Sequence, residues 1–367
     1  MTRFGVCASL ALVGFLFATA APAASPDRMA WDVFAAMTAP AGAPGVKAVA
    51  FETWASDDDI YSGKSPKWPA PGAKHLTRSL AAVSELLAVH GAAAPPADCL
   101  PKDGKAGNFP PGACIGEEVQ HNRPVFQYIV ANNLYSTAGL AAAYGATKPI
   151  DFPKDSIVVK ADWVLIADLL RWLPYAYRTA ADVRRAYYTN TATMNGRAGE
   201  YALVGMSVQS KALPQWLWMT FEHRSNPGRC DIIGCHDDFG ALLANLPSRL
   251  VPNTDYGPCL KTLALVQLFA SRHLDPVWTN YCLKGTQVAF GTAAGPTILA
   301  NSVIERMNKG VPVPDTSCIT CHAYSAFDKH GAPNYAVLPK RPVGPVNPAL
   351  LHCFKTHDYL WSILAAH

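Results

Sequence analysis

The sequence predicts an α+β fold, with a central antiparallel sheet flanked by helices and a mainly helical C-terminal part. Three stretches in the middle of the chain are rich in β-branched and aromatic residues, as is typical of strands: residues 156–166, 201–209 and 215–222. Pro214 separates the last two and marks a bend or a sheet edge. We therefore expect a mixed α/β region over residues 25–255 and a mainly helical region over residues 256–367.

Residues 1–24 have the pattern of a secretory signal peptide. Arg3 supplies a positive charge, residues 6–16 form an apolar core, and Ala21-Pro22-Ala23 fits a cleavage site. The apolar run is too short to cross a bilayer, and no later segment reaches the length of a transmembrane helix. The pattern predicts export to the periplasm or secretion, and a mature chain without a transmembrane segment.

Two helices are expected before the first strand and should flank the sheet. The first covers residues 76–90 and is followed by a Gly- and Pro-rich loop over residues 92–116. The second covers residues 122–144, with Asn122 as its N-cap and Pro124 in its first turn.

Several apolar stretches follow residue 255. They predict one strand over residues 281–290 and helices over residues 258–273, 296–308 and 316–327. The second of these helices has Pro296 at its start and Gly310 just beyond its end, the usual asymmetry of helix termini. Because helical patterns outnumber strands here, we expect the C-terminal region to be mainly helical.

The composition is that of a globular chain able to bury a large core. Half of the residues are hydrophobic, 16% are charged, and the formal net charge is +4. Lysine and arginine are scattered rather than clustered, which argues against a nucleic-acid partner. No Gly-rich phosphate loop follows a predicted strand, so nothing indicates nucleotide binding.

The most specific motif is Ser-Cys-Ile-Thr-Cys-His at residues 317–322. Cys-x-x-Cys-His is the attachment signature of c-type haem, in which two thiols bond to the haem and the histidine binds its iron. On a helix, Cys318, Cys321 and His322 stand at i, i+3 and i+4 and project from one face. A thioredoxin-like site would need a βαβ context, and a zinc site a second ligand pair; neither stands out. The motif therefore predicts one covalent haem c, with His322 as the proximal iron ligand.

The cysteines also indicate an oxidising compartment. Of ten cysteines, Cys7 leaves with the signal peptide and two would hold haem, so seven should mostly pair. Sequence proximity suggests the bridges Cys99–Cys114, Cys230–Cys235 and Cys259–Cys282, with Cys353 left over. The alternative is that several of the seven are buried free thiols, a common environment for cysteine.

The third predicted strand carries an unusual aromatic stretch. Alternation places Leu217, Met219, Phe221 and His223 on one side, and on the other Trp216, Trp218, Thr220 and Glu222. Either this is a well-packed core strand, or its Met219 and His223 face lies against the haem, which needs apolar walls.

The motif Cys318-x-x-Cys321-His322 with an export signal resembles a monohaem c-type cytochrome. Combined with Trp216-x-Trp218-x-Thr220-Phe221-Glu222-His223, it resembles a group of secreted bacterial cytochrome c proteins of unassigned function. Small soluble cytochromes c have the motif near the N-terminus and a methionine ligand after it, whereas no methionine follows His322 here. The resemblance implies haem attachment at Cys318, Cys321 and His322, and leaves the sixth iron ligand open.

Two donors are our candidates for that distal position. His223 is the first and Met307, on the predicted helix before the motif, is the second, although Met307 also fits ordinary core filling. The histidines after the motif are expected in a loop, at the surface or at caps: His330, His352 and His357. We expect a histidine-ligated or vacant distal site rather than methionine coordination.

Two main classes of function follow. The first is electron transfer through the haem iron to a redox partner protein, which the base rate of single-motif proteins favours. The alternative is a haem enzyme, or a gas- or peroxide-binding protein, with an open distal site, which the length of the chain favours. A haem-anchored module for an apolar ligand is a third reading that rests only on the tryptophan content. No catalytic residue is indicated.

Overall fold

The computed structural model describes residues 24–41, 48–62, 65–70, 113, 115–194, 197–247, 256–303, 313–333 and 337–366. The helix expected over residues 76–90, Cys99, Cys114 and Met307 lie outside the described residues, as does all but the last residue of the expected signal peptide. The α-helices of the described part are α1 (Pro26–Met37), α2 (Asp57–Tyr61), α4 (Arg123–Ala131), α5 (Thr137–Gly145), α6 (Ile166–Trp172), α7 (Ala180–Ala186), α8 (Leu263–Ser271) and α10 (Cys318–Ala323). Short 3-10 helices are η1 (Ala50–Thr53), η2 (Pro276–Asn280), η3 (Val313–Asp315), η5 (Pro348–Leu351) and η6 (Trp361–Ala365).

The predicted central antiparallel sheet is confirmed. It has seven strands, six of them in the order β1-β2-β3-β5-β6-β7, while β4 pairs with β5 outside this path. All these pairs are antiparallel. The three strands expected in the middle of the chain are β3, β5 and β6, and the strand expected over residues 281–290 is β7. The bounds are β1 (Ala55–Ser56), β2 (Ile115–His121), β3 (Ile157–Leu165), β4 (Thr189–Met194), β5 (Arg197–Ser210), β6 (Leu217–His223) and β7 (Tyr281–Gln287).

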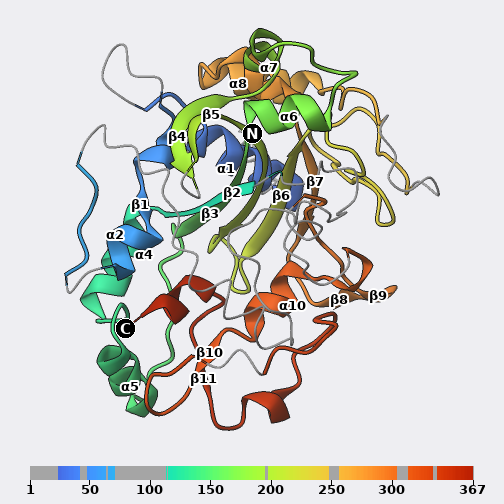
Figure 1. Cartoon of the computed structure of the whole chain (residues 1–367). Helices are drawn as coiled ribbons and strands as arrows, with labels where there is room; N and C mark the ends of the chain where they lie inside the picture. The colour runs from blue at the N-terminus through green and yellow to red at the C-terminus, as the bar shows by residue number, and fades with distance from the viewer. Residues whose placement is uncertain are drawn as a thin grey trace, which may run out of the picture.

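Helices pack on both faces of the sheet (Figure 1). Its strands carry apolar side chains on both sides, and these require cover. The first face packs against α1, α8 and η2 through an aromatic cluster that includes Trp31, Phe34 and Trp278. The second face packs against α6 and α7 at one end. At its other end lie α4, α5, α10 and η6. The haem motif thus belongs to the second face.

The single helix expected over residues 122–144 is instead two helices, α4 and α5. Its beginning is as predicted, because the Asn122 side chain accepts a hydrogen bond from the Val125 amide at 3.4 Å. The break falls at Asn133, which has a φ of 54°. Asparagine tolerates this left-handed conformation, which ends a helix.

The prediction of a mainly helical C-terminal part is not supported. In the described residues after 255, the only α-helices are α8 and α10, and β7 joins the central sheet. Four further short strands pair in twos: β8 (Gly291–Thr292) with β9 (Gly295–Pro296), and β10 (Ala326–Phe327) with β11 (Lys355–Thr356). The helix expected over residues 296–308 is absent from its described part, 296–303. There the backbone bonds to distant groups, as when the Ser302 amide donates to the Glu222 carboxylate at 2.8 Å.

Two of the three predicted disulfides are confirmed. Cys230 bonds to Cys235, and Cys259 bonds to Cys282. Cys353 is exposed and free, as expected for the cysteine left over. Disulfides persist in oxidising compartments, so these two bridges fit a protein outside the cytosol.

Thiol titration tests the complete pairing scheme. Denatured but unreduced holoprotein should react with about one equivalent of a thiol reagent, at Cys353, if Cys99 also pairs with Cys114. Full reduction should raise the count to seven in the mature chain. A count of five or more before reduction would show that most of these cysteines are thiols.

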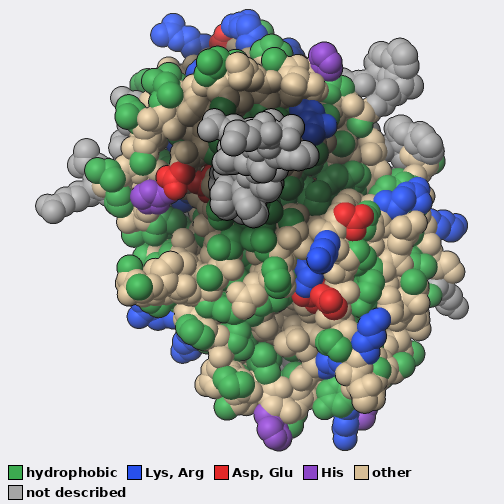
Figure 2. All heavy atoms as spheres, turned by 180° about the vertical axis from the view of Figure 1, so that it is seen from behind, with side chains coloured by type: hydrophobic (Ala, Val, Ile, Leu, Met, Phe, Trp, Pro, Cys, Tyr) green, Lys and Arg blue, Asp and Glu red, His purple; other side chains and the backbone are tan. Residues whose placement is uncertain are grey.

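On the face seen in Figure 2, neither basic nor acidic side chains form a large cluster of their own. Lysine and arginine side chains there are interspersed with aspartate and glutamate, and hydrophobic side chains border a hollow. In the described stretches of the chain, no helix combines the length and apolarity needed to cross a bilayer.

Candidate haem-binding site

The haem motif forms the helix α10, whose first turn is well defined. Ser317 is the N-cap, and its side chain accepts from the Thr320 amide at 3.4 Å. Cys318, Cys321 and His322 follow within this one short helix, so the i, i+3 and i+4 spacing predicted from the sequence is realised. The three groups that would hold the haem edge and iron therefore lie on neighbouring turns of a single element.

The central sheet fixes the start of this helix through Gln287, the last residue of β7. The Gln287 amide donates to the Ser317 hydroxyl at 2.7 Å, and its oxygen accepts from the Ile319 amide at 2.9 Å. Gln287 stands opposite Trp218 in the register between β7 and β6. This cross-strand pair thus supports the motif with the polar side chain of Gln287 and the aromatic side chain of Trp218.

His322 is held in the form that binds iron. Its Nδ1 lies 2.9 Å from the carbonyl oxygen of Tyr359, which can only accept, so Nδ1 carries the proton and Nε2 keeps its lone pair. Burial lowers the pKa of His322 from 6.5 to about 4, with the Tyr359 hydrogen bond opposing the shift. The imidazole is therefore neutral at physiological pH. Histidines that bind metals typically donate their other ring N–H to a carbonyl or carboxylate in this way.

Aromatic side chains surround the histidine. The ring of Trp218 lies 4.6 Å from that of His322, and the ring of Trp361 lies 6.3 Å from it. Cys318 packs against one apolar cluster and Cys321 against another, which includes Tyr324. The motif residues themselves are half-buried, and these contacts give them apolar neighbours of the kind that a haem needs.

The face of β6 that meets the motif is the opposite of the one predicted. Leu217, Met219 and Phe221 point into the aromatic cluster with α1 and α8. Trp216 and Trp218 point to the other face, in the cluster that contains Ile319 of α10. The expectation that the Met219 and His223 face packs against the haem is therefore wrong, because α1 and α8 already cover that face.

The structure does not bring His223 to the haem motif. His223 lies five residues along β6 from Trp218, roughly 17 Å at strand spacing, and its ring stacks on Tyr187 at 3.5 Å, in the cluster of α6 and α7. Its Nε2 donates to the Ala186 carbonyl at 3.0 Å and its Nδ1 accepts from the Ser225 amide at 3.2 Å. Burial lowers the pKa of His223 well below 6.5. Both ring nitrogens are thus engaged, and no lone pair is left for iron.

The histidines after the motif lie in two environments. His330 and His352 are exposed, as expected. His357 is fully buried, which corrects the expectation of a surface or capping residue. Its Nδ1 lies 2.6 Å from the Ser325 hydroxyl and its ring stacks on Phe327. Burial lowers the pKa of His357 to about 3, so this ring is neutral as well.

A buried ion pair behind the motif was not predicted. Lys284 of β7 and Glu222 of β6 lie 3.3 Å apart, and both side chains are buried. The Glu222 carboxylate also accepts from the amide and the hydroxyl of Ser302. Ser302 belongs to the segment in which Leu299 pairs with Ser317 and accepts from the Cys318 thiol at 3.1 Å. The ion pair thus fixes a segment that lies directly against the haem helix.

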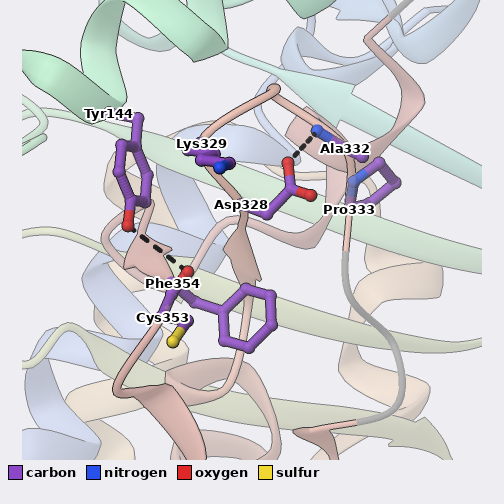
Figure 3. A pocket seen from close by; sticks show the side chains of 7 residues that line it. All are labelled: Tyr144, Asp328, Lys329, Ala332, Pro333, Cys353 and Phe354. Carbon is purple, nitrogen blue, oxygen red and sulfur yellow. Dashed lines mark hydrogen bonds between the residues drawn. The ribbon is translucent and has the colours of Figure 1, made fainter.

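A cavity of about 450 Å³ lies between α5 and the β10–β11 pair (Figure 3). Tyr144 donates to the Cys353 carbonyl across it at 3.5 Å, and the Ala332 amide donates to Asp328 at 2.9 Å. Phe354 lines the cavity and also packs in the cluster that holds Cys321. The cavity is therefore a neighbour of the motif, but none of the predicted haem or iron ligands lines it.

Comparison of the chain with known protein families, with curated proteins and with solved structures finds no match. Within the described ranges, no group of three or more His, Cys, Asp or Glu side chains is arranged to hold a bare metal ion. The site is therefore defined by its own geometry: a short helix with two thiols, a neutral histidine and apolar walls.

Proposed function

We propose that this protein carries one covalently bound c-type haem and transfers electrons through its iron. The observation that carries the proposal is the state of His322, whose Nδ1–H is fixed by the Tyr359 carbonyl and whose Nε2 lone pair is available. The residues present fit the group, because two thiols, one neutral imidazole and an apolar surround are what a c-type haem requires. When bound, the haem supplies a one-electron couple.

The side chains of this chain would hold the group as follows. Cys318 and Cys321 would form the two thioether links, and His322 would bind the iron from the proximal side. Trp218 and Trp361, whose rings lie 4.6 and 6.3 Å from the imidazole, would reduce the access of water to the iron. A dry, low-dielectric surround favours the less charged oxidation state and so sets the reduction potential.

We further propose that the protein is periplasmic or secreted, with a redox protein as its partner. The two disulfides and the pattern of residues 1–24 support this compartment.

The alternative function is binding or conversion of a small ligand at an open distal site. This alternative is favoured because His223, our first candidate for the sixth ligand, already uses both ring nitrogens in hydrogen bonds. An iron without a distal protein ligand would bind carbon monoxide, whereas a six-coordinate electron carrier would not.

Absorption spectra of the exported holoprotein test both proposals. We expect haem that stays with the polypeptide in acidified organic solvent, and a mass increase equal to one haem. Haem that is extracted, or an unchanged mass, would refute covalent attachment. Reduced spectra recorded with and without carbon monoxide then separate the two functions, since a shift of the Soret band would favour the open site.

A further inference from the structure

An apolar patch lies far from the haem motif. It consists of six large aliphatic side chains with these exposed fractions: Leu242 58%, Leu243 76%, Leu246 74%, Leu260 54%, Leu263 71% and Val266 47%. Single exposed hydrophobic residues are ordinary, but contiguous groups of this size mark interaction sites.

The six side chains belong to one continuous surface. Residues 241–242 pair with residues 260–261, since the Leu242 amide donates to the Leu260 carbonyl at 2.9 Å and Ala241 forms a bridge with Lys261, and Leu243 and Leu246 follow directly along the chain. Helix α8 starts directly afterwards, and its residues Leu263 and Val266 stand at i and i+3 on one helix face.

Helix α8 is largely apolar, with Gln267 and Ser271 as its polar residues. Leu265 and Phe269 are buried in the aromatic cluster of the first sheet face, while Leu263 and Val266 point outward. A helix of this kind is normally covered on both sides. Across residues 239–247 and 260–271, Lys261 is the only charged residue, and its ammonium group donates inward to the Tyr281 carbonyl at 2.6 Å. Helix α8 itself therefore carries no charged side chain, and the first one beyond it is the exposed Arg272 at its C-cap.

We propose that this patch is the interface of a homodimer, in which it packs against the same patch of a second copy of the chain. At about 100 Å² per leucine side chain, the six residues expose on the order of 400 Å² of aliphatic surface. A standard interface buries roughly 800 Å² per partner, and about 65% of this area is apolar in homodimers. The patch supplies most of that apolar area, and a two-fold axis through it would place the same six residues of the two copies in contact.

The chemistry of the patch argues against the other occupants. Membrane-binding surfaces combine apolar side chains with lysine, arginine and tryptophan. In the described stretches 239–247 and 260–271, the one such residue is Lys261, whose ammonium group is engaged by the Tyr281 carbonyl. A redox partner would dock near the haem. The patch lies on the face of α8, which covers the first sheet face, whereas α10 lies on the second (Figure 1). The dimer would thus leave both haem motifs accessible.

Sedimentation velocity of the exported holoprotein tests this inference. We expect a species of twice the chain mass that dissociates on dilution. Leu243→Asp and Leu263→Asp should each raise the dissociation constant by at least about tenfold, because each would bury a charge at the interface. Leu350→Asp serves as the control, since Leu350 is 40% exposed on η5, outside the patch.

The outcomes separate clearly. A monomer at 100 μM total chain, or a dimer that both patch variants leave unchanged, would overturn the inference. If the protein is monomeric and co-sediments with phosphatidylcholine vesicles, and if Leu243→Asp abolishes this co-sedimentation, the patch binds a membrane instead. Near-ultraviolet circular dichroism confirms that each variant folds. The measurement needs no bound haem, so its result is independent of the proposed function.

Discussion

His322→Ala should abolish the native haem spectrum while leaving haem attached to the polypeptide. The two thioether links depend on Cys318 and Cys321, whereas the iron depends on the imidazole, so the variant separates attachment from ligation. We expect a displaced Soret band and a reduction potential altered by far more than any surface change would cause. Absorption spectroscopy and redox titration of the purified holoprotein measure both quantities.

Two controls make this result specific. His352→Ala removes an exposed histidine thirty residues further on and should leave the spectrum unchanged. Free imidazole added to His322→Ala should restore part of the native spectrum by filling the space of the lost side chain. A native spectrum in His322→Ala would refute the assignment of His322 as proximal ligand. Cys318→Ser should in turn leave a single thioether and a poorly matured product.

Lys284→Met should destabilise the fold by about 3–5 kcal/mol, since it leaves the buried Glu222 carboxylate without its counter-charge. Denaturant unfolding monitored by tryptophan fluorescence measures the change in the free energy of unfolding. The double variant Glu222→Gln/Lys284→Met removes both charges and should recover a large part of this loss.

A surface pair provides the matched control for this prediction. Arg184 and Glu200 form a bridge of 2.7 Å in which the arginine side chain is 54% exposed. Arg184→Met should cost no more than about 1 kcal/mol, because solvent screens exposed pairs. Equal losses in Lys284→Met and Arg184→Met would show that burial of the Glu222 pair does not govern its energetics.

Local signals in the sequence located β3, β5, β6 and β7 of the central sheet and the helix of the haem motif, but they missed β1, β2 and β4. β-Branched residues and alternation located β3, β5 and β6, and the spacing of Cys318, Cys321 and His322 located their common helix. The same alternation also sorted the side chains of β6 into two faces. It could not tell which face meets the motif, because both are apolar and the choice depends on segments far along the chain.

Two helices were predicted wrongly, over residues 296–308 and as a single helix over residues 122–144. The first error comes from a polar side chain that is distant in the sequence. The stretch 296–303 has the proline of a helix start, but Glu222 binds its Ser302 amide and holds the backbone out of a helix. A single glutamate in an otherwise apolar strand was the available signal, since a buried charge requires a partner. The break after α4 had a local signal as well, in the pair Asn132-Asn133, because asparagine disfavours helix interiors.

The supports of α10 come from widely separated parts of the chain. Gln287 bonds to Ser317 thirty residues later, and His322 bonds to Tyr359 thirty-seven residues further on. The ring of Trp218 also meets that of His322 across about a hundred residues of chain, and contacts so distant in sequence form slowly because long loops must close first. The proposed attachment of haem requires only five consecutive residues with accessible thiols. Under the proposed attachment, haem would be added before Trp218 and Tyr359 close over the motif, and we expect a variant that folds faster to be loaded less completely.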